Sequence, residues 1–237
     1  MMKNSGKPIY RVILIFCIVV FLGCVGYLIN LYKQPAMAEK EIEDLSESIS
    51  ETITENGYNE NAYPENCVAW LEIKDTKINY PVMQKEDSPE YYLRKNYKGE
   101  YSYSGTPFLD ADCKLGESQN LIVYGHNMKD GTMFSTLSKY KSREFYQKHP
   151  TINLIVECDV WEYDIVSVNI VKDTDEWYYF KDYGDKDKTN NLISQTMKKS
   201  LYSTGNTADY SDSFLTLSTC DYSSDNARLI IIAKRSE

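Results

Sequence analysis

The chain has 237 residues, of which 42% are hydrophobic and 26% charged, a balance typical of a folded globular protein. This length predicts one ordinary domain with an appendage. The 26 basic and 35 acidic residues give a formal net charge of −9, which argues against a nucleic-acid-binding protein, because phosphate contacts need clustered lysine and arginine. The 21 tyrosines favour a β-rich structure, since tyrosine has a high strand propensity.

The N-terminus carries an apolar run, 12–31, that is long enough for a helix to cross a bilayer. Lys3, Lys7 and Arg11 precede it, which favours a cytoplasmic N-terminus. We therefore expect a cytoplasmic tail at 1–11, a transmembrane signal-anchor at 12–32, a stalk with an N-terminal helix at 33–60 and an extracellular domain at 61–237. The alternative is a cleaved signal peptide, because residues 36–38 read Ala-Met-Ala, although the apolar run is longer than such peptides usually carry.

The stalk has the pattern of an amphipathic helix. Between 38 and 53 its apolar residues are spaced by three and four positions, which places them on one helical face. The sequence Asn-Gly at 56–57 predicts the end of this helix. We expect the helix to serve as a stalk or to pack on the domain that follows.

The rest of the chain alternates short β-rich runs with turns. Few helices accompany these runs, which favours a closed β-barrel over a doubly wound sheet. Two segments, 132–148 and 188–201, carry apolar residues at helical spacing and are expected to be helical inserts that face the core. The eight expected strands are residues 68–73, 78–83, 105–109, 120–124, 151–156, 161–171, 214–219 and 228–234.

The cysteines and histidines do not predict a metal site or a cofactor. No CxxC occurs, and the two histidines are not at metal-ligand spacing. The acidic run 182–187 is better explained as a solvated loop than as a cation site. A disulfide among Cys67, Cys113 and Cys158 and buried free thiols are both compatible with the sequence, the free thiols being the simpler interpretation.

Cys220 ends one expected strand and Arg228 begins the next, with a polar turn between them. If the two strands form an antiparallel hairpin, these residues become neighbours at the same end of the ladder. Alternation places Leu215 and Leu217 on the core side and puts Ser218 and Cys220 on the opposite face. An adjacent cation favours the thiolate, which is the nucleophilic form of cysteine.

His126 follows the expected strand 120–124 in the sequence Gly-His-Asn. An imidazole on such a loop titrates near neutral pH and can protonate an amine leaving group and then deprotonate an incoming amine. The other histidine, His149, is more simply a residue at a helix end.

Two segments resemble the signatures of class B sortases. Residues 124–134, Tyr-Gly-His-Asn-Met-Lys-Asp-Gly-Thr-Met-Phe, are similar to the histidine signature. Residues 216–220, Thr-Leu-Ser-Thr-Cys, with Arg228 opening the next strand, are similar to the cysteine and arginine signature. Residues 69–73, 80–82 and 105–110 resemble the early strands of the family, and the resemblance spans roughly 67–234.

The resemblance implies a mainly β fold: an eight-stranded sortase-type barrel with an N-terminal helix, and a long helix between the sixth and seventh strands. It implies a cysteine transpeptidase that cuts a C-terminal sorting signal after threonine, with an NPxTx or [SNP]PxTG-like motif. Cys220 is the expected nucleophile, His126 the general acid and base, and Arg228 the oxyanion stabiliser. Ser218, and less directly Asp221, are expected to contact substrate.

The implied partners are secreted proteins with a sorting signal, and peptidoglycan or its lipid-linked precursor, whose amine accepts the acyl group. The eight-residue gap from Cys220 to Arg228 disfavours an L,D-transpeptidase, whose arginine follows the cysteine almost directly. A papain-like peptidase would place its cysteine ahead of its histidine. The remaining alternative is a non-catalytic, membrane-tethered barrel that binds wall components.

Overall fold

The computed structural model describes residues 7–56, 62–157 and 159–236. Within this part of the chain, eight strands close into a barrel with the order β1-β2-β3-β4-β7-β8-β6-β5, so the expected fold is confirmed. β4 pairs in parallel with β7, and β7 pairs antiparallel with β8. The strands are β1 (Cys67–Glu72), β2 (Asn79–Met83), β3 (Phe108–Leu109), β4 (Asn120–Tyr124), β5 (Thr151–Val156), β6 (Asp159–Lys172), β7 (Phe214–Cys220) and β8 (Ala227–Arg235).

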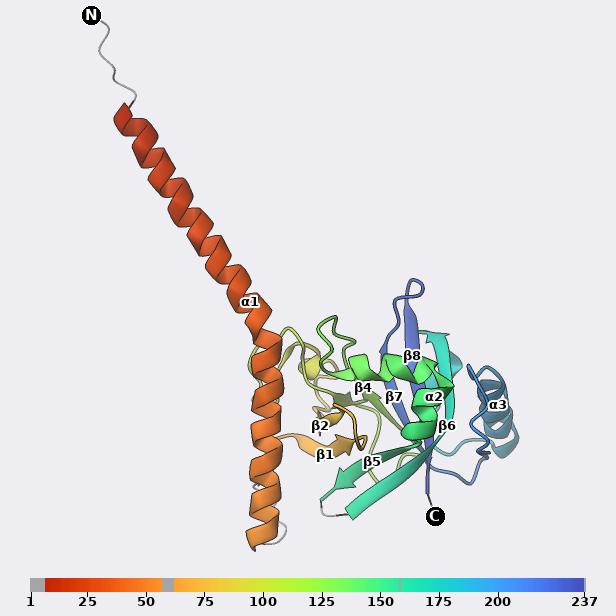
Figure 1. Cartoon of the computed structure of the whole chain (residues 1–237). Helices are drawn as coiled ribbons and strands as arrows, with labels where there is room; N and C mark the ends of the chain where they lie inside the picture. Colours follow the sequence, from red (N-terminus) through yellow and green to blue (C-terminus); the bar gives the residue numbers. More distant parts are fainter. Residues whose placement is uncertain (1–6, 57–61, 158, 237) are drawn as a thin grey trace, which may run out of the picture.

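The apolar run of β8 is explained by burial on both faces. Leu229 and Ile231 belong to the main core cluster, whereas Ile230 and Ile232 belong to a second cluster. The second cluster includes Trp177 of the 3-10 helix η4 (Glu176–Tyr179) and Ile193 of the helix α3 (Lys186–Lys198). Strands buried on both faces read as continuous hydrophobic runs. Figure 1 shows α3 beside the barrel near β6.

A continuous helix, α1 (Lys7–Asn56), replaces the two helical segments expected at 12–31 and 38–53. Pro35 lies within it; a proline in a helix removes one backbone hydrogen bond and bends the helix without necessarily ending it. Figure 1 shows α1 changing direction between the half that projects away and the half beside the barrel. The structure describes α1 as far as Asn56, and Gly57 of the expected Asn-Gly helix end lies outside the described residues.

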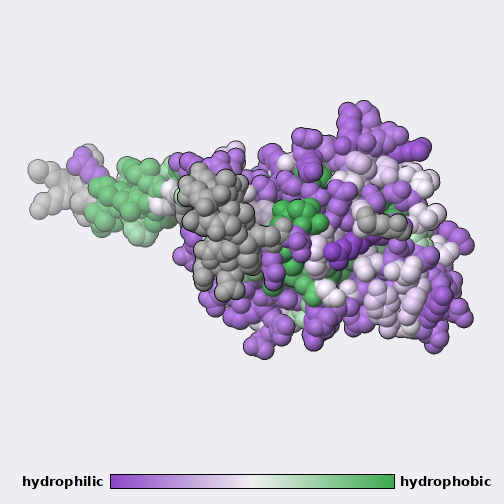
Figure 2. All heavy atoms as spheres, turned by 90° about the horizontal axis from the view of Figure 1, so that it is seen from below, coloured by the Kyte–Doolittle hydropathy of each residue, from purple (hydrophilic) through white to green (hydrophobic). Residues whose placement is uncertain are grey.

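The two halves of α1 have different surroundings. The segment Ile9–Ile29 is long and apolar enough to cross a membrane, and Figure 2 shows its hydrophobic surface projecting from a largely hydrophilic body. In the other half, Ile42 and Ile49 are buried in the main core cluster. Glu39 accepts a hydrogen bond of 3.0 Å from the Tyr80 hydroxyl, and the Ser46 hydroxyl accepts one from the side-chain amide of Asn79. The stalk half is therefore part of the folded domain.

The segment 132–148 is not the single helix that its apolar spacing suggests. It forms the 3-10 helix η3 (Phe134–Lys141) and the helix α2 (Arg143–Lys148), separated by the extended backbone of Ser142. The expected core contacts are nevertheless confirmed, since Phe134, Leu137 and Tyr140 are all buried.

The helix expected at 188–201 begins and ends earlier. The Asp185 carboxylate accepts a hydrogen bond of 3.0 Å from the Lys188 backbone N–H and caps the first turn of α3. Ile193 faces the core, as expected, but Leu201 lies beyond the helix and is 44% exposed. The prediction that Leu201 belongs to the apolar face of this helix was wrong.

Cys67 and Cys113 are free thiols, so a disulfide between them is not present. Burial raises the pKa of Cys67 to about 12 and that of Cys113 to about 11, which keeps both thiols protonated at neutral pH. Cys158, the third cysteine considered for a bridge, lies outside the described residues.

Candidate active site

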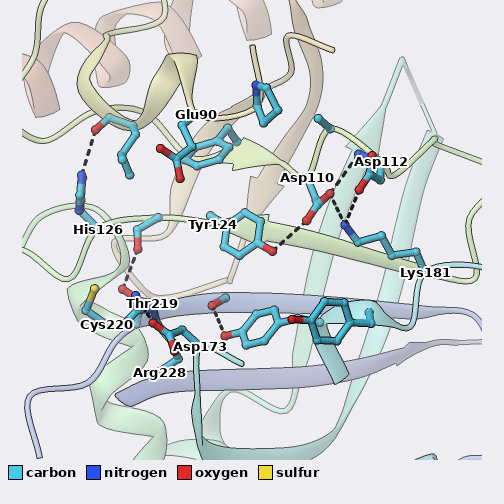
Figure 3. A pocket seen from close by; sticks show the side chains of 18 residues that line it. Glu90, Asp110, Asp112, Tyr124, His126, Asp173, Lys181, Thr219, Cys220 and Arg228 are labelled. Atoms are coloured by element: carbon cyan, nitrogen blue, oxygen red, sulfur yellow. Dashed lines mark hydrogen bonds and ion pairs between the residues drawn. The ribbon is translucent and has the colours of Figure 1, made fainter. Parts of the chain in front are cut away.

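A cavity of about 650 Å³ opens at the end of β7 and β8, and Cys220, His126 and Arg228 all line it. Figure 3 shows Cys220 and His126 at one end of this cavity, with Asp110, Asp112 and Lys181 at the other. The structure therefore brings the three expected catalytic side chains together.

The hairpin formed by β7 and β8 positions the cysteine and the arginine. Cys220 is directly opposite Arg228 in the antiparallel register. The turn between them is closed by a 2.9 Å hydrogen bond from the Asp221 N–H to the Ala227 carbonyl. Asn226 has a φ of 58°, a left-handed conformation that asparagine adopts more readily than most residues. The half-buried Cys220 side chain remains accessible from the cavity.

The loop that carries His126 is attached to the cysteine strand by three hydrogen bonds. The Gly125 N–H donates to the Ser218 carbonyl at 3.1 Å. The Thr219 hydroxyl donates to the Gly125 carbonyl at 2.7 Å, and the Asn127 side-chain amide donates to the Cys220 carbonyl at 2.8 Å. These bonds continue the parallel pairing of β4 with β7 and fix the backbone of His126 beside that of Cys220.

Gly125 has a packing role next to His126. A Cβ added at this position would lie 2.6 Å from atoms of the Phe134 ring, closer than non-bonded carbon atoms approach. The fully buried Phe134 begins η3, and its N–H donates to the His126 carbonyl at 2.9 Å. The loop and η3 therefore pack closely only because residue 125 is a glycine.

The His126 ring is held in a definite tautomer. Its Nε2 lies 2.9 Å from the Leu93 carbonyl, the contact marked by the dashed line from His126 in Figure 3. A carbonyl oxygen only accepts, so Nε2 carries the proton and Nδ1 holds the lone pair of the neutral ring. Burial lowers the pKa of His126; the Leu93 carbonyl opposes this effect and the nearby cation of Arg94 adds to it.

Arg228 is paired with an acidic residue that the sequence did not single out. Its Nη2 lies 3.7 Å from Oδ2 of Asp173, and both side chains are about one third exposed. Asp173 follows β6, where Val171 is paired with Arg228 and the Asp173 N–H donates to the Asn226 carbonyl. The signal that identifies Asp173 is thus the β6–β8 pairing, a tertiary contact.

The two expected substrate-contacting residues have different surroundings. Ser218 lines the cavity, and its hydroxyl is 2.7 Å from the Tyr178 hydroxyl. Burial raises the pKa of Tyr178 to about 12, so this phenol stays protonated at neutral pH. Asp221 does not line the cavity. Its side chain is 1% exposed and forms an ion pair with Lys141, a placement that favours a role in holding the turn.

The far end of the cavity carries a charged cluster that sequence reasoning missed. Lys181 contacts Asp110, and its Nζ lies 3.3 Å from Oδ2 of Asp112. The Tyr124 hydroxyl donates to Asp110 at 2.9 Å. These residues come from three separate segments, so no local sequence pattern joins them. Across the described residues, there is no group of three or more metal-ligating side chains.

A sortase domain model matches residues 71–236. The chain is 33% identical over 174 residues to sortase B of Listeria monocytogenes, and 28% identical over 173 residues to sortase B of Staphylococcus aureus. Both matches cover 72% of this chain and 70% of the relative.

Solved structures show the same relationship. Sortase B of Clostridium perfringens matches with a TM-score of 0.68 and 30% identity over 73% of this chain and 94% of that chain. A sortase B–substrate complex from S. aureus matches in fold with a TM-score of 0.77 at 23% identity, over 86% of this chain and 98% of that chain. The chain belongs to the sortase family of cysteine transpeptidases, within class B.

Proposed function

We propose that this chain cleaves a C-terminal sorting signal after threonine and transfers the acyl group, through a thioester on Cys220, to an amine of a cell-wall peptide. The observation that carries the proposal is the single cavity lined by Cys220, His126 and Arg228. Covalent catalysis divides the exchange of one amide for another into two easier steps.

In the first step, Nδ1 of His126 takes the thiol proton of Cys220, the sulfur attacks the threonine carbonyl, and the carbon–nitrogen bond of the scissile amide breaks. The leaving amine takes a proton from His126. In the second step, an incoming amine gives a proton to His126 and displaces the sulfur. The side of the ring available for these transfers is Nδ1, because Nε2 is bonded to the Leu93 carbonyl.

Arg228 supplies a permanent positive charge to the oxyanion that forms on the carbonyl oxygen. Its planar guanidinium donates two hydrogen bonds in fixed directions. Asp173 orients this group through the 3.7 Å ion pair while leaving the cavity face of the arginine open to substrate. Ser218 and Tyr178, which are hydrogen-bonded to each other, form part of the wall on which the sorting signal lies.

The placement in the cell is part of the same proposal. The segment Ile9–Ile29 crosses the membrane, Lys3 and Lys7 before it remain in the cytoplasm, and the domain from 61 onward lies outside. There it meets secreted proteins that carry a sorting signal and the peptidoglycan precursor. The expected motifs are of the NPxTx or [SNP]PxTG-like type.

The test is cleavage of fluorogenic peptides with these motifs by the full-length chain in detergent. We expect the wild type to cut after threonine, and Cys220→Ala to lose cleavage while keeping its fold by circular dichroism. Cys24→Ala is the matched control, since Cys24 lies in the apolar half of α1, and it should retain full rate. Cleavage by Cys220→Ala at the wild-type rate would instead favour a non-catalytic barrel contaminated by another peptidase.

A further inference from the structure

A second cavity, of about 880 Å³, adjoins the active-site cavity at His126, whose side chain lines both. One wall is the part of α1 just beyond the apolar span, with Ala36, Glu39 and Glu43. The other wall is the loop that follows His126, including Asp130, and Tyr222 of the turn after β7 completes it. The proposed reaction with the sorting signal does not by itself require this space.

A transpeptidase needs two substrates at one carbonyl. The acyl donor occupies the cavity that holds Cys220, so the acceptor must approach from another side. By microscopic reversibility, the incoming amine takes the place that the leaving amine vacated, within reach of the same acid–base group. A space that begins at His126 meets this requirement.

The charges of the second cavity suit a ligand that carries both an ammonium and a carboxylate group. The lining carries charges of both signs: three carboxylates, from Glu39, Glu43 and Asp130, and four cations, from Lys40, Lys77, Arg94 and Lys129. The Glu39 Oε1 accepts from the Tyr80 hydroxyl, but its buried Oε2 has no hydrogen-bond partner among the described residues. An unpaired buried carboxylate oxygen is costly and is satisfied by an ammonium donor. The four cations suit the carboxylate of the same ligand.

The position along α1 places this cavity close to the bilayer. Glu39 comes ten residues after Ile29, the end of the apolar span, which corresponds to about 15 Å of helix. A peptide attached to a membrane lipid reaches a cavity at this distance from the bilayer more readily than it reaches the outer face of the barrel. The half of α1 that forms the wall is fixed by the buried Ile42, so the wall is a defined surface.

We propose that the cavity between α1 and the His126 loop is the acceptor site, which binds a short peptide bearing a primary amine and a carboxylate. This inference rests on the proposed function. The bound amine attacks the thioester carbonyl: a carbon–nitrogen bond forms, the carbon–sulfur bond breaks, the amine proton passes to His126, and the thiolate of Cys220 is regenerated. When the acceptor site is empty, a water molecule in the position of the amine attacks the thioester carbonyl instead and hydrolyses it.

The experiment measures donor cleavage and aminolysis separately, with the full-length chain in detergent. The donor is a fluorogenic sorting peptide that ends shortly after the cleaved bond, and the acceptor probe is triglycine, with N-acetyltriglycine as the probe without an amine. The variants are Ala36→Trp, which fills the cavity, and Glu39→Gln with Glu43→Gln, which removes two charges. Glu47→Gln is the matched control, because Glu47 is an exposed residue of α1 outside the cavity lining.

We expect both cavity variants to raise the KM for triglycine about tenfold or more and to shift the product from the amide to the hydrolysed acid. In the absence of acceptor, their rate of donor cleavage should stay within about twofold of the wild-type rate. Glu47→Gln should match wild type, and N-acetyltriglycine should give no amide. Unchanged triglycine KM in both cavity variants, with normal donor cleavage, overturns the acceptor site alone. Absence of donor cleavage in the wild type removes the proposed function, and the inference with it.

Discussion

The thiol of Cys220 differs from the other described barrel thiols in its surroundings. Cys67 and Cys113 are held as neutral thiols by burial, with pKa values raised to about 12 and 11. Cys220 is half-buried, lines an open cavity and lies opposite an arginine in the β7–β8 ladder. Thiol chemistry in this domain is therefore expected to concentrate at Cys220.

The arginine opposite Cys220 is expected to act through its shape as well as its charge. Arg228→Lys keeps the charge but loses the planar pair of donors. We expect kcat/KM for a sorting peptide to fall about 100-fold, the usual effect of losing an oxyanion donor. Arg235→Lys is the control: Arg235 lies on the same strand but over the Trp161 ring, 4.2 Å from its centroid. Near-normal kinetics for Arg228→Lys would remove Arg228 from the mechanism.

The titration of His126 gives a second test at this scale. Burial, with a smaller contribution from Arg94, lowers its pKa, so an NMR titration should give a value below the ordinary value of about 6.5. Arg94→Ala should raise it. Because the folded chain binds this proton less tightly than the unfolded chain, the contribution of His126 to stability is complete above about pH 6.5 and is lost as the pH falls below it. A measured pKa above 6.5 would contradict this description of the site.

At the scale of elements, the active site depends on how the loop after β4 packs on η3 and β7. Gly125→Ala would push a methyl group into the Phe134 ring. We expect the free energy of unfolding to fall by about 1–3 kcal/mol, as in other overpacked cores. We expect kcat to fall by a larger fraction of its wild-type value than the free energy of unfolding does, because His126 is the next residue.

The matched control for this substitution is Gly184→Ala. A Cβ at position 184 meets nothing closer than 3.7 Å. The melting temperature and kcat of the Gly184→Ala variant should therefore stay at the wild-type values. Thermal denaturation and steady-state kinetics make the comparison. Equal melting temperatures for the two variants would show that the loop can move away from η3.

Elements with a strong local signal were predictable, and the contacts between distant elements were not. Short β-rich runs separated by turns located every strand, and the hairpin from 214 to 234 placed Cys220 opposite Arg228, as the β7–β8 register confirms. The break at Ser142 was missed because the apolar spacing continues across it. Asp173 and Lys181 were missed because their partners come from distant strands and loops.

At the scale of the whole molecule, α1 joins an apolar span to the catalytic domain without an intervening flexible segment in the described chain. Figure 1 shows one end of this helix beside the barrel and the other far from it. The sequence indicated an anchor and an amphipathic helix that serves as a stalk or packs on the following domain, and the burial of Ile42 and Ile49 in the main core cluster shows the packed alternative.

Two truncations separate the roles of the halves of α1. Removing residues 1–31 should give a water-soluble protein with a melting temperature close to that of the full chain. Removing residues 1–56 should lower it by several degrees, because burial of each isoleucine contributes about 1.5–3 kcal/mol. Differential scanning fluorimetry of both proteins is the measurement, and equal melting temperatures would mean that α1 does not stabilise the barrel.

In the proposed reaction, one sulfur, that of Cys220, carries the acyl group between two amines. The most direct measurement mixes the full-length chain with a sorting peptide, quenches in acid and locates the adduct by mass spectrometry of proteolytic fragments. We expect an acyl fragment ending in threonine on Cys220, removed by hydroxylamine as a thioester should be. Turnover of the peptide with the fragment on another residue, or at an unchanged rate in Cys220→Ala, would contradict it.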